Sequence, residues 1–214
     1  YPRDFEKDSA LVRELGGDVL YAPEPENMYA PDHATWVEVP ALANTLCGLS
    51  RPIHFRGVCT VVLKLFMLAQ PSLAVFGEKD WQQLAIIKKM VSDLNVPVEV
   101  VGRPIVREAD GLALSSRNVY LTPEERAQAP QIRKSLEMAA GLAAGGERDA
   151  ARIIEAVRGY LAEHLPTGEE DYISVVDPAV LTKVDRIGDM ALCALAIRLG
   201  KARLIDNILL KVGE

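Results

Sequence analysis

Apolar residues recur at helical spacing in some stretches of this chain and form short continuous runs in others. The helical spacing covers residues 4–15, 57–70 and 80–94. The short apolar runs, which predict strands, cover residues 18–22, 73–76 and 96–101. Helices and strands therefore alternate through the first hundred residues, which is typical of a parallel sheet with helices on its faces, and we expect residues 73–76 to be a buried strand.

The pattern changes after residue 107. Thr122, Pro123 and Glu125 form a capping-box sequence, which predicts a helix from there to Gly145-Gly146. A further helix is expected at residues 149–164. Three later runs predict the strands of an antiparallel sheet, at residues 172–176, 190–199 and 202–205. The fold class is therefore α/β, with an N-terminal α/β domain in residues 1–105, a small α+β domain in residues 106–214, and the boundary near residues 104–107.

Composition narrows the possible partners. The 214 residues are 49% apolar and carry a net charge of −6, and their basic residues are scattered, which argues against sequence-independent binding to nucleic acid. Cys47, Cys59 and Cys193 lie far apart, so we expect neither a disulfide framework nor a zinc site, and a reducing cytoplasm fits best. The longest apolar stretch is too short to cross a bilayer, and we expect no membrane association.

The segment after the strand at residues 73–76 has the composition of a phosphate-binding turn. Gly77 lets a phosphate approach the backbone, and Lys79 can balance phosphate charge. Asp80 can hold Mg²⁺, and the amide of Gln83 can bind a hydroxyl or a carboxylate. Asp80 and Gln83 also match a capping box, which needs no ligand, and the sequence leaves both interpretations open.

Two other segments carry candidate phosphate ligands. Ser115, Ser116 and Arg117 place two hydroxyls and a permanent cation in succession, although such a run also occurs in ordinary surface loops. Arg51 is a further candidate cation at the entry to a long apolar helix. His54, close to it, is more simply a structural histidine at the start of that helix.

Several motifs together resemble the pantoate–β-alanine ligase family, a branch of the nucleotidyltransferase superfamily with a Rossmann-like fold. The matching segments are residues 1–3, 51–57, 77–83, 102–107, 110–118 and 202–207. The resemblance implies a two-step reaction in which the carboxylate of pantoate attacks the α-phosphate of ATP, and the amine of β-alanine then displaces AMP. It also implies a homodimer. We expect Mg²⁺ as a cofactor, because the crowded phosphates need neutralising charge. We further expect the C-terminal domain to close over ATP by a hinge near Pro104, because residues 115–117 must reach ATP from that domain.

The resemblance assigns roles to individual residues. Lys79 and Arg117 are the expected catalytic residues, Gln83 is expected to bind pantoate, and Arg51 is a weaker candidate. The residues expected to contact ATP are Gly77, Glu78, Lys79, Asp80, Val106, Leu114, Ser115, Ser116 and Arg117.

The sequence also departs from the family pattern. The family begins with a strand, a Pro-Thr-Met-Gly turn and a His-x-Gly-His signature, and these do not occur in the 214 residues. We therefore expect the chain as given to be inactive without that N-terminal segment. The alternatives are a related cytidylyl- or adenylyltransferase, which Gln83 argues against, and a non-catalytic truncated module that only binds a partner or a second copy.

Overall fold

The computed structural model describes residues 4–213, which form two compact units that divide between Thr35 and Trp36. The first unit contains helix α1 (Phe5–Glu14) and the single turn α2 (Pro25–Met28). Asp4 caps α1 by accepting a hydrogen bond from the backbone amide of Lys7 at 3.0 Å, as expected for an acidic N-cap. The family motif at residues 1–3 lies outside the described residues.

The strand predicted at residues 18–22 is wrong. These residues run without regular structure and pair with no strand in the described part of the chain. Their composition favours a strand, but a strand needs a neighbour to accept and donate its backbone hydrogen bonds.

The second unit begins with helices and a parallel pair of strands. The helices are α3 (Pro40–Ala43), α4 (Cys47–Ser50), α5 (His54–Ala69) and α6 (Trp81–Asp93). Strand β1 (Leu73–Gly77) pairs in parallel with β2 (Glu99–Arg103), and the 3₁₀ turn η1 (Glu78–Asp80) links β1 to α6. The predicted alternation of helix and strand is thus confirmed, although α5 begins three residues earlier than expected and β2 begins three residues later. The prediction that β1 is a buried strand is wrong on one face, where Leu73 and Val75 are exposed.

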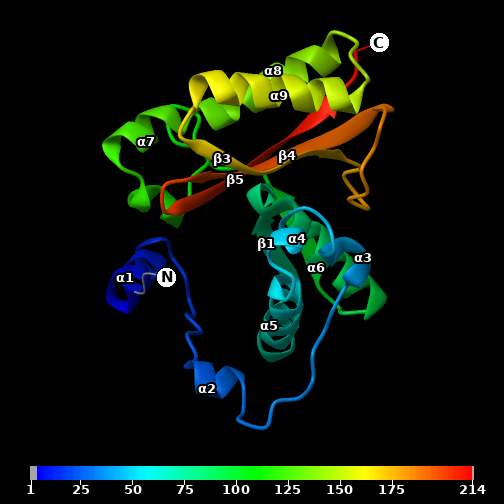
Figure 1. Cartoon of the computed structure of the whole chain (residues 1–214). Coiled ribbons are helices and arrows are strands. Elements are labelled where there is room, and N and C mark those ends of the chain that lie inside the picture. The colour runs from blue at the N-terminus through cyan, green and yellow to red at the C-terminus, as the bar shows by residue number, and fades with distance from the viewer. Residues whose placement is uncertain (1–3, 214) are drawn as a thin grey trace. The chain divides into compact units, whose positions relative to one another are not determined.

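The C-terminal part is an antiparallel sheet covered by two helices. Its strands are β3 (Gly168–Val176), β4 (Met190–Leu199) and β5 (Ala202–Lys211), in the order β3-β4-β5. Helices α8 (Gln131–Ala144) and α9 (Ala150–His164) lie together over one face of this sheet (Figure 1). The antiparallel prediction is confirmed, and β3 and β5 are longer than their apolar runs indicated.

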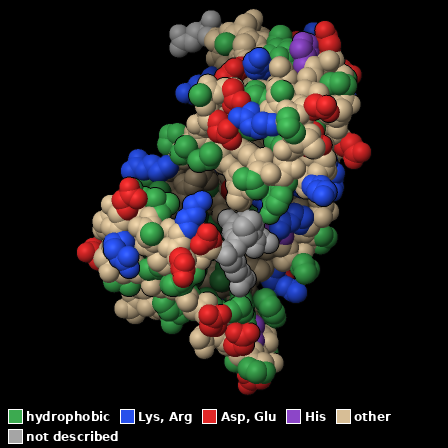
Figure 2. Space-filling view, turned by 90° about the vertical axis from the view of Figure 1, so that its left-hand side faces the viewer, with side chains coloured by type: hydrophobic (Ala, Val, Ile, Leu, Met, Phe, Trp, Pro, Cys, Tyr) green, Lys and Arg blue, Asp and Glu red, His purple; other side chains and the backbone are tan. Residues whose placement is uncertain are grey.

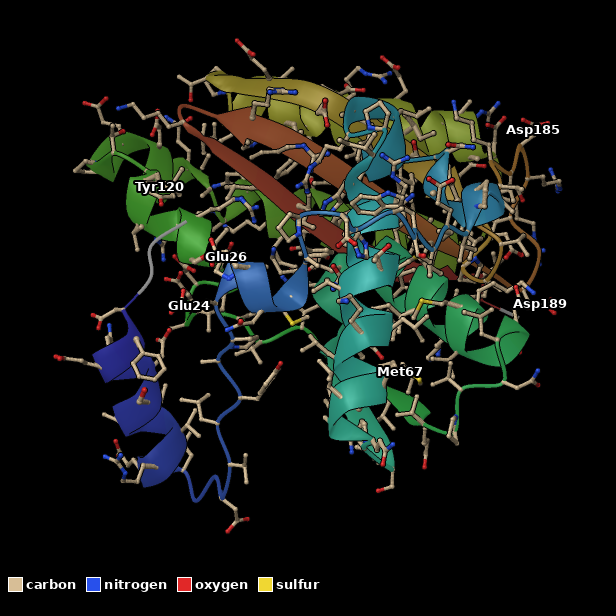
Figure 3. All side chains as sticks on the ribbon, turned by 90° about the horizontal axis from the view of Figure 1, so that it is seen from below. Glu24, Glu26, Met67, Tyr120, Asp185 and Asp189 are labelled. Carbon is tan, nitrogen blue, oxygen red and sulfur yellow. The ribbon has the colours of Figure 1, made fainter. Side chains whose placement is uncertain are left out.

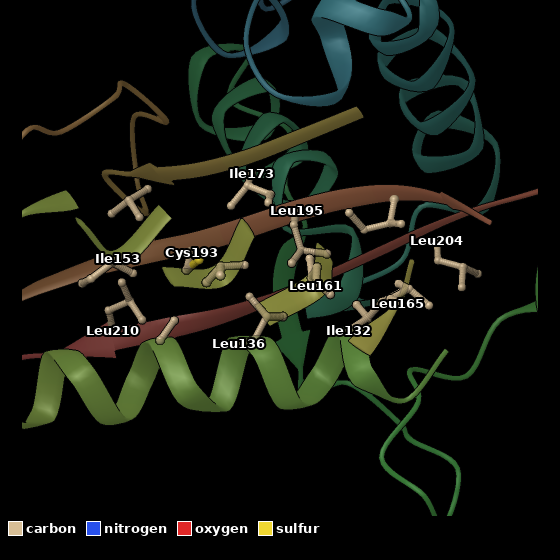
Figure 4. Close-up of a cluster of buried hydrophobic side chains, with 14 of the residues drawn as sticks. Ile132, Leu136, Ile153, Leu161, Leu165, Ile173, Cys193, Leu195, Leu204 and Leu210 are labelled. Carbon is tan, nitrogen blue, oxygen red and sulfur yellow. The ribbon is translucent and has the colours of Figure 1, made fainter. Parts of the chain in front are cut away.

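A continuous apolar core fills the space between these helices and the sheet. In Figure 4, Ile132 and Leu136 of α8 point towards Cys193 and Leu195 of β4. Burial of side chains of this size contributes about 1.5–3 kcal/mol each. A second apolar cluster lies on the opposite face, where Leu192 and other sheet residues pack with Ile86 and Met90 of α6 and with Phe55 of α5. The sheet therefore has apolar packing on both faces, and β4 at its centre is almost wholly buried.

The helix predicted from residue 123 to residue 145 is interrupted. Helix α7 (Pro123–Gln128) starts with the expected capping box at Thr122 and Glu125, and α8 begins as a separate helix after Pro130. Proline lacks an amide hydrogen, and its ring clashes with the preceding turn, so the continuous helix is broken there. Later in the chain, β3 and β4 are joined by an irregular connection that contains Asp185 and Asp189 (Figure 3).

Candidate functional site

The turn that follows β1 opens on a cavity of about 420 Å³. Lys79 and Asp80 line the cavity from η1, and Gln83 lines it from the first turn of α6. Asp80 is the N-cap residue of α6, but its side chain accepts no capping hydrogen bond. The capping-box interpretation of Asp80 and Gln83 is therefore wrong, and the Asp80 carboxylate remains available to a ligand.

The rest of the cavity wall comes from segments far apart in the sequence. Arg51 contributes from the end of α4 and His54 from the start of α5, and Arg117 contributes from the 3₁₀ helix η2 (Ser116–Tyr120). The other lining residues are Leu46, Cys47, Phe55, Trp81, Gln82, Tyr172, Ala194, Arg203, Ile205, Asp206 and Asn207. Basic groups outnumber carboxylates in this wall, and the cavity therefore suits a small anionic ligand.

Two arginines, Arg107 and Arg126, hold the base of the loop that carries Arg117. On one side, the guanidinium of Arg107 donates two hydrogen bonds to the carboxylate of Asp206, at 2.7 and 2.9 Å, and a third to the carbonyl of Gly111 at 3.0 Å. On the other side, Arg126 of α7 pairs with Glu108 and with Asp110. The base of the loop is therefore attached both to the buried strand β5 and to an outer helix.

Inside the loop, local hydrogen bonds shape the segment that precedes Arg117. Ser115 accepts a bond from the Arg117 amide at 3.2 Å, and the Leu114 amide donates to the Val106 carbonyl at 2.9 Å. Asn118 donates to Glu108 at 2.7 Å and to the Ala113 carbonyl at 3.2 Å. These bonds make the segment an ordered turn, from which Arg117 reaches the cavity.

Another part of the cavity wall depends on Gln82, which is buried. Its side chain accepts a hydrogen bond from the Cys47 amide at 3.0 Å and donates to the carbonyls of Leu42 and Thr45 at 2.8 and 2.7 Å. These bonds stabilise the backbone at Leu46, whose φ of 46° is unfavourable for a residue with a branched side chain. Sequence reasoning singled out Gln83 and missed this role of its neighbour.

Burial and neighbouring charges change the pKa values of two basic groups in the cavity. Burial is the largest cause that lowers the pKa of Lys79, and Arg117 lowers it further, while Asp80 opposes the shift. Burial also lowers the pKa of His54, helped by Arg51 and other nearby cations. His54 is therefore mostly neutral at pH 7, whereas the buried charge of Lys79 would be compensated by a bound anion.

A cluster of polar side chains lines the cavity next to β3 and β5. Arg203 donates to Asp171 at 2.6 and 3.0 Å, and its guanidinium lies 3.5 Å from the sulfur of Cys47. The hydroxyl of Tyr172 is 3.3 Å from the same sulfur. Burial would raise the pKa of Asp171, but hydrogen bonds from Arg203 and Ser50 lower it overall.

The cavity brings together five of the residues predicted from the sequence, namely Arg51, Lys79, Asp80, Gln83 and Arg117. The remaining six predicted residues do not line it; they are Gly77, Glu78, Val106, Leu114, Ser115 and Ser116. Val106 and Leu114 are adjacent and exposed. The sequence analysis gave no role to Cys47, Tyr172, Arg203, Asp206 or Asn207, although the last three lie in the motif at residues 202–207.

Asp80 fits one requirement of a magnesium site. Mg²⁺ commonly takes one or two carboxylates and completes its coordination with phosphate oxygens and water. The second acidic side chain in the wall, Asp206, already holds Arg107. Within residues 4–213 there is no cluster of three or more His, Cys, Asp or Glu side chains that could hold a metal ion.

Two surface properties bear on possible partners. On the face shown in Figure 2, Lys and Arg side chains are interspersed with Asp and Glu side chains. No helix in the described part of the chain is long and apolar enough to cross a membrane.

Comparisons with known proteins extend over nearly the whole chain. A family model described as pantoate-β-alanine ligase matches residues 1–209. A pantothenate synthetase from Nitratidesulfovibrio vulgaris (strain Miyazaki F) is 65% identical over 214 residues, which are 100% of this chain and 75% of that protein. The crystal structure of pantothenate synthetase from Thermus thermophilus superposes with a TM-score of 0.92 at 47% identity, over 97% of this chain and 75% of that one.

A more distant structure carries ligands. It is a pantoate-β-alanine ligase from Francisella tularensis, complexed with β-γ ATP and β-alanine. It is 30% identical, has a TM-score of 0.75, and the match covers 98% of this chain and 71% of that one.

Proposed function

This chain belongs to the pantoate–β-alanine ligase family, and we propose that its cavity activates the carboxylate of pantoate with ATP and then joins it to β-alanine. The products are pantothenate, AMP and pyrophosphate. The observation that carries this proposal is the convergence of Lys79, Asp80, Gln83 and Arg117 on one cavity from two segments, residues 79–83 and η2, that are far apart in the sequence.

The first step needs cations and alignment more than it needs a base. A carboxylate is already ionised at neutral pH, so it can attack the α-phosphate without losing a proton. The barrier comes from the negative charge that gathers on the phosphate and from bringing the two anions together. Lys79 and Arg117 approach the cavity from different elements, η1 and η2, and can neutralise this charge from two sides.

The remaining residues of the proposed site divide into three groups. Gln83 binds pantoate, and Arg51 supplies a further cation. Asp80 would hold Mg²⁺, whose charge helps to neutralise the phosphates. The other ATP contacts are Gly77, Glu78, Val106, Leu114, Ser115 and Ser116, which adjoin the cavity residues in sequence or lie in the same loop.

Because more than half of the proposed ATP contacts do not line the cavity, we propose that residues 106–214 close over ATP relative to residues 1–105, with a hinge near Pro104. The exposed side chains of Val106 and Leu114 would then cover an apolar part of the nucleotide. Identical small-angle scattering profiles of the full-length protein with and without ATP would contradict closure.

We also propose a cytoplasmic homodimer. Cys47, Cys59 and Cys193 are all free and buried, which suits a reducing compartment. The homodimer rests on the family resemblance, and light scattering of the purified protein measures it directly.

The proposed function is tested by pyrophosphate release in the full-length protein with ATP, Mg²⁺ and pantoate. Lys79→Ala and Arg117→Ala should each slow adenylate formation by about 10²-fold or more, which corresponds to on the order of 3 kcal/mol of transition-state stabilisation. Release that does not depend on pantoate would refute the function, and near-normal rates in either variant would reject that residue's role.

A further inference from the structure

Strand β5 contacts the 3₁₀ turn η1, which carries Lys79. Asn207 lies on this strand, is only 6% exposed, and follows Asp206, the residue that anchors Arg107. The two adjacent residues thus contact both elements that supply the proposed catalytic cations, η1 on one side and the 106–118 loop on the other.

The amide of Asn207 makes two hydrogen bonds to the turn. Its nitrogen Nδ2 donates to the carbonyl of Glu78 at 3.0 Å and to the carbonyl of Lys79 at 3.1 Å. Both partners are acceptors, so the nitrogen must face them and the opposite orientation of the amide is excluded. The backbone amide of Asn207 also donates to Asp206 at 2.8 Å, which further fixes this part of the strand.

These two bonds hold the backbone on both sides of Lys79. The carbonyl of Glu78 belongs to the peptide plane before the Lys79 Cα atom, and the carbonyl of Lys79 belongs to the plane after it. When both planes are fixed, the direction of the Cα–Cβ bond is fixed as well, and so is the direction in which the side chain leaves the backbone. A 3₁₀ turn as short as η1 has few hydrogen bonds of its own and poorer bond geometry than an α-helix, so support from outside the turn matters here.

We infer that Asn207 is a positioning residue, which acts by holding the η1 backbone so that the Lys79 ammonium points into the cavity. This inference rests on the proposed function, since it assigns Asn207 to the adenylation step in which Lys79 takes part. Asn207 also lines the cavity, but its side-chain nitrogen directs its hydrogens to the carbonyls of Glu78 and Lys79 and not into the cavity. Its effect on rate therefore passes through Lys79, and this dependence separates positioning from a general contribution to stability.

The test is a double-mutant cycle in the full-length protein, with single-turnover pyrophosphate release as the readout. Asn207→Ala should slow adenylation by about 10- to 100-fold, because small displacements of catalytic groups have effects of this size. In the Lys79→Ala background the same substitution should change the rate less than about 3-fold, since the group that Asn207 positions is already absent.

A matched control comes from the core. Ser135 is fully buried and donates a hydrogen bond to the carbonyl of Ile132 at 2.8 Å inside α8, away from the cavity. Ser135→Ala likewise removes a buried side-chain bond to a carbonyl, and it should leave the adenylation rate unchanged. Asn207→Asp provides a second variant of the same size that replaces the donor with an acceptor, and it should slow the reaction at least as much as Asn207→Ala.

Equal slowing by Asn207→Ala with and without Lys79, or wild-type rates in both Asn207 variants, would overturn the inference while leaving the proposed function intact. Failure of both variants to fold would assign Asn207 to stability alone and would also overturn it. An unchanged rate in Lys79→Ala would instead remove Lys79 from the reaction, and the inference would fail together with that part of the proposed function.

Discussion

Arg107 and Arg126 both hold the loop that carries Arg117, but the burial of their carboxylate partners differs sharply. The side chain of Asp206 is 2% exposed and that of Arg107 is 19% exposed, whereas those of Arg126 and Glu108 are 31% and 28% exposed. Arg107→Met would leave a carboxylate inside the protein, and within residues 4–213 its remaining hydrogen-bond donor would be the backbone amide of Asn207. Breaking a buried pair in this way costs about 3–5 kcal/mol of unfolding free energy.

The more exposed pair, Arg126 with Glu108, provides the comparison for this cost in stability. Arg126→Met should cost about 1 kcal/mol or less, because water can solvate the carboxylates that it leaves behind. With a denaturation slope of about 3 kcal/mol per molar urea, Arg107→Met should lower the urea midpoint by about 1 M or more, and Arg126→Met by about 0.3 M or less. Equal shifts in the two variants, measured by circular dichroism of the full-length protein, would refute the argument that burial decides the cost.

Three further predictions concern α5 and α6. Gln83→Ala should raise the KM for pantoate without changing the melting temperature, and unchanged pantoate kinetics would remove Gln83 from the site. Gln82→Ala, one residue earlier, should lower the unfolding free energy by about 3 kcal/mol, because three backbone groups, two of them in buried hydrogen bonds, lose their partner. A shift below about 1 kcal/mol in urea would contradict this. The lowered pKa of His54 means that the unfolded chain binds a proton first as the pH falls through 6.5. Stability should therefore fall below that pH in the wild type more than in His54→Gln, and parallel pH profiles of the two proteins would argue against the shift.

Much of the fold could be predicted because local pattern and final structure agree. The capping box at Thr122 and the apolar run at residues 190–199 both form the elements that they predict. The wrong predictions fall where the secondary structure depends on a neighbouring strand or on a proline. Residues 18–22 have strand composition but no strand beside them in the described part, and Pro130 divides a helix whose apolar periodicity continues on both sides.

The site was predictable in its residue types and less so in its geometry. Lys79, Asp80 and Arg117, which line one cavity, could be chosen as candidates because glycine, hydroxyl and cationic residues follow an apolar strand or a turn. Nothing in the sequence shows that Asp206 and Asn207, in a strand far along the chain, hold the two segments that carry these groups. Such contacts depend on long-range packing, and a single sequence carries no record of it.

The structure also explains why two polar residues lie next to each other in the buried middle of β5. A buried carboxylate and a buried amide would weaken β5 if they were unpaired, since each would lose its contacts with water. Asp206 binds Arg107, and Asn207 binds the carbonyls of Glu78 and Lys79, so both are satisfied only when the loop and the turn are in place. The same hydrogen bonds that satisfy these groups therefore join the folding of β5 to the placement of Lys79 and Arg117.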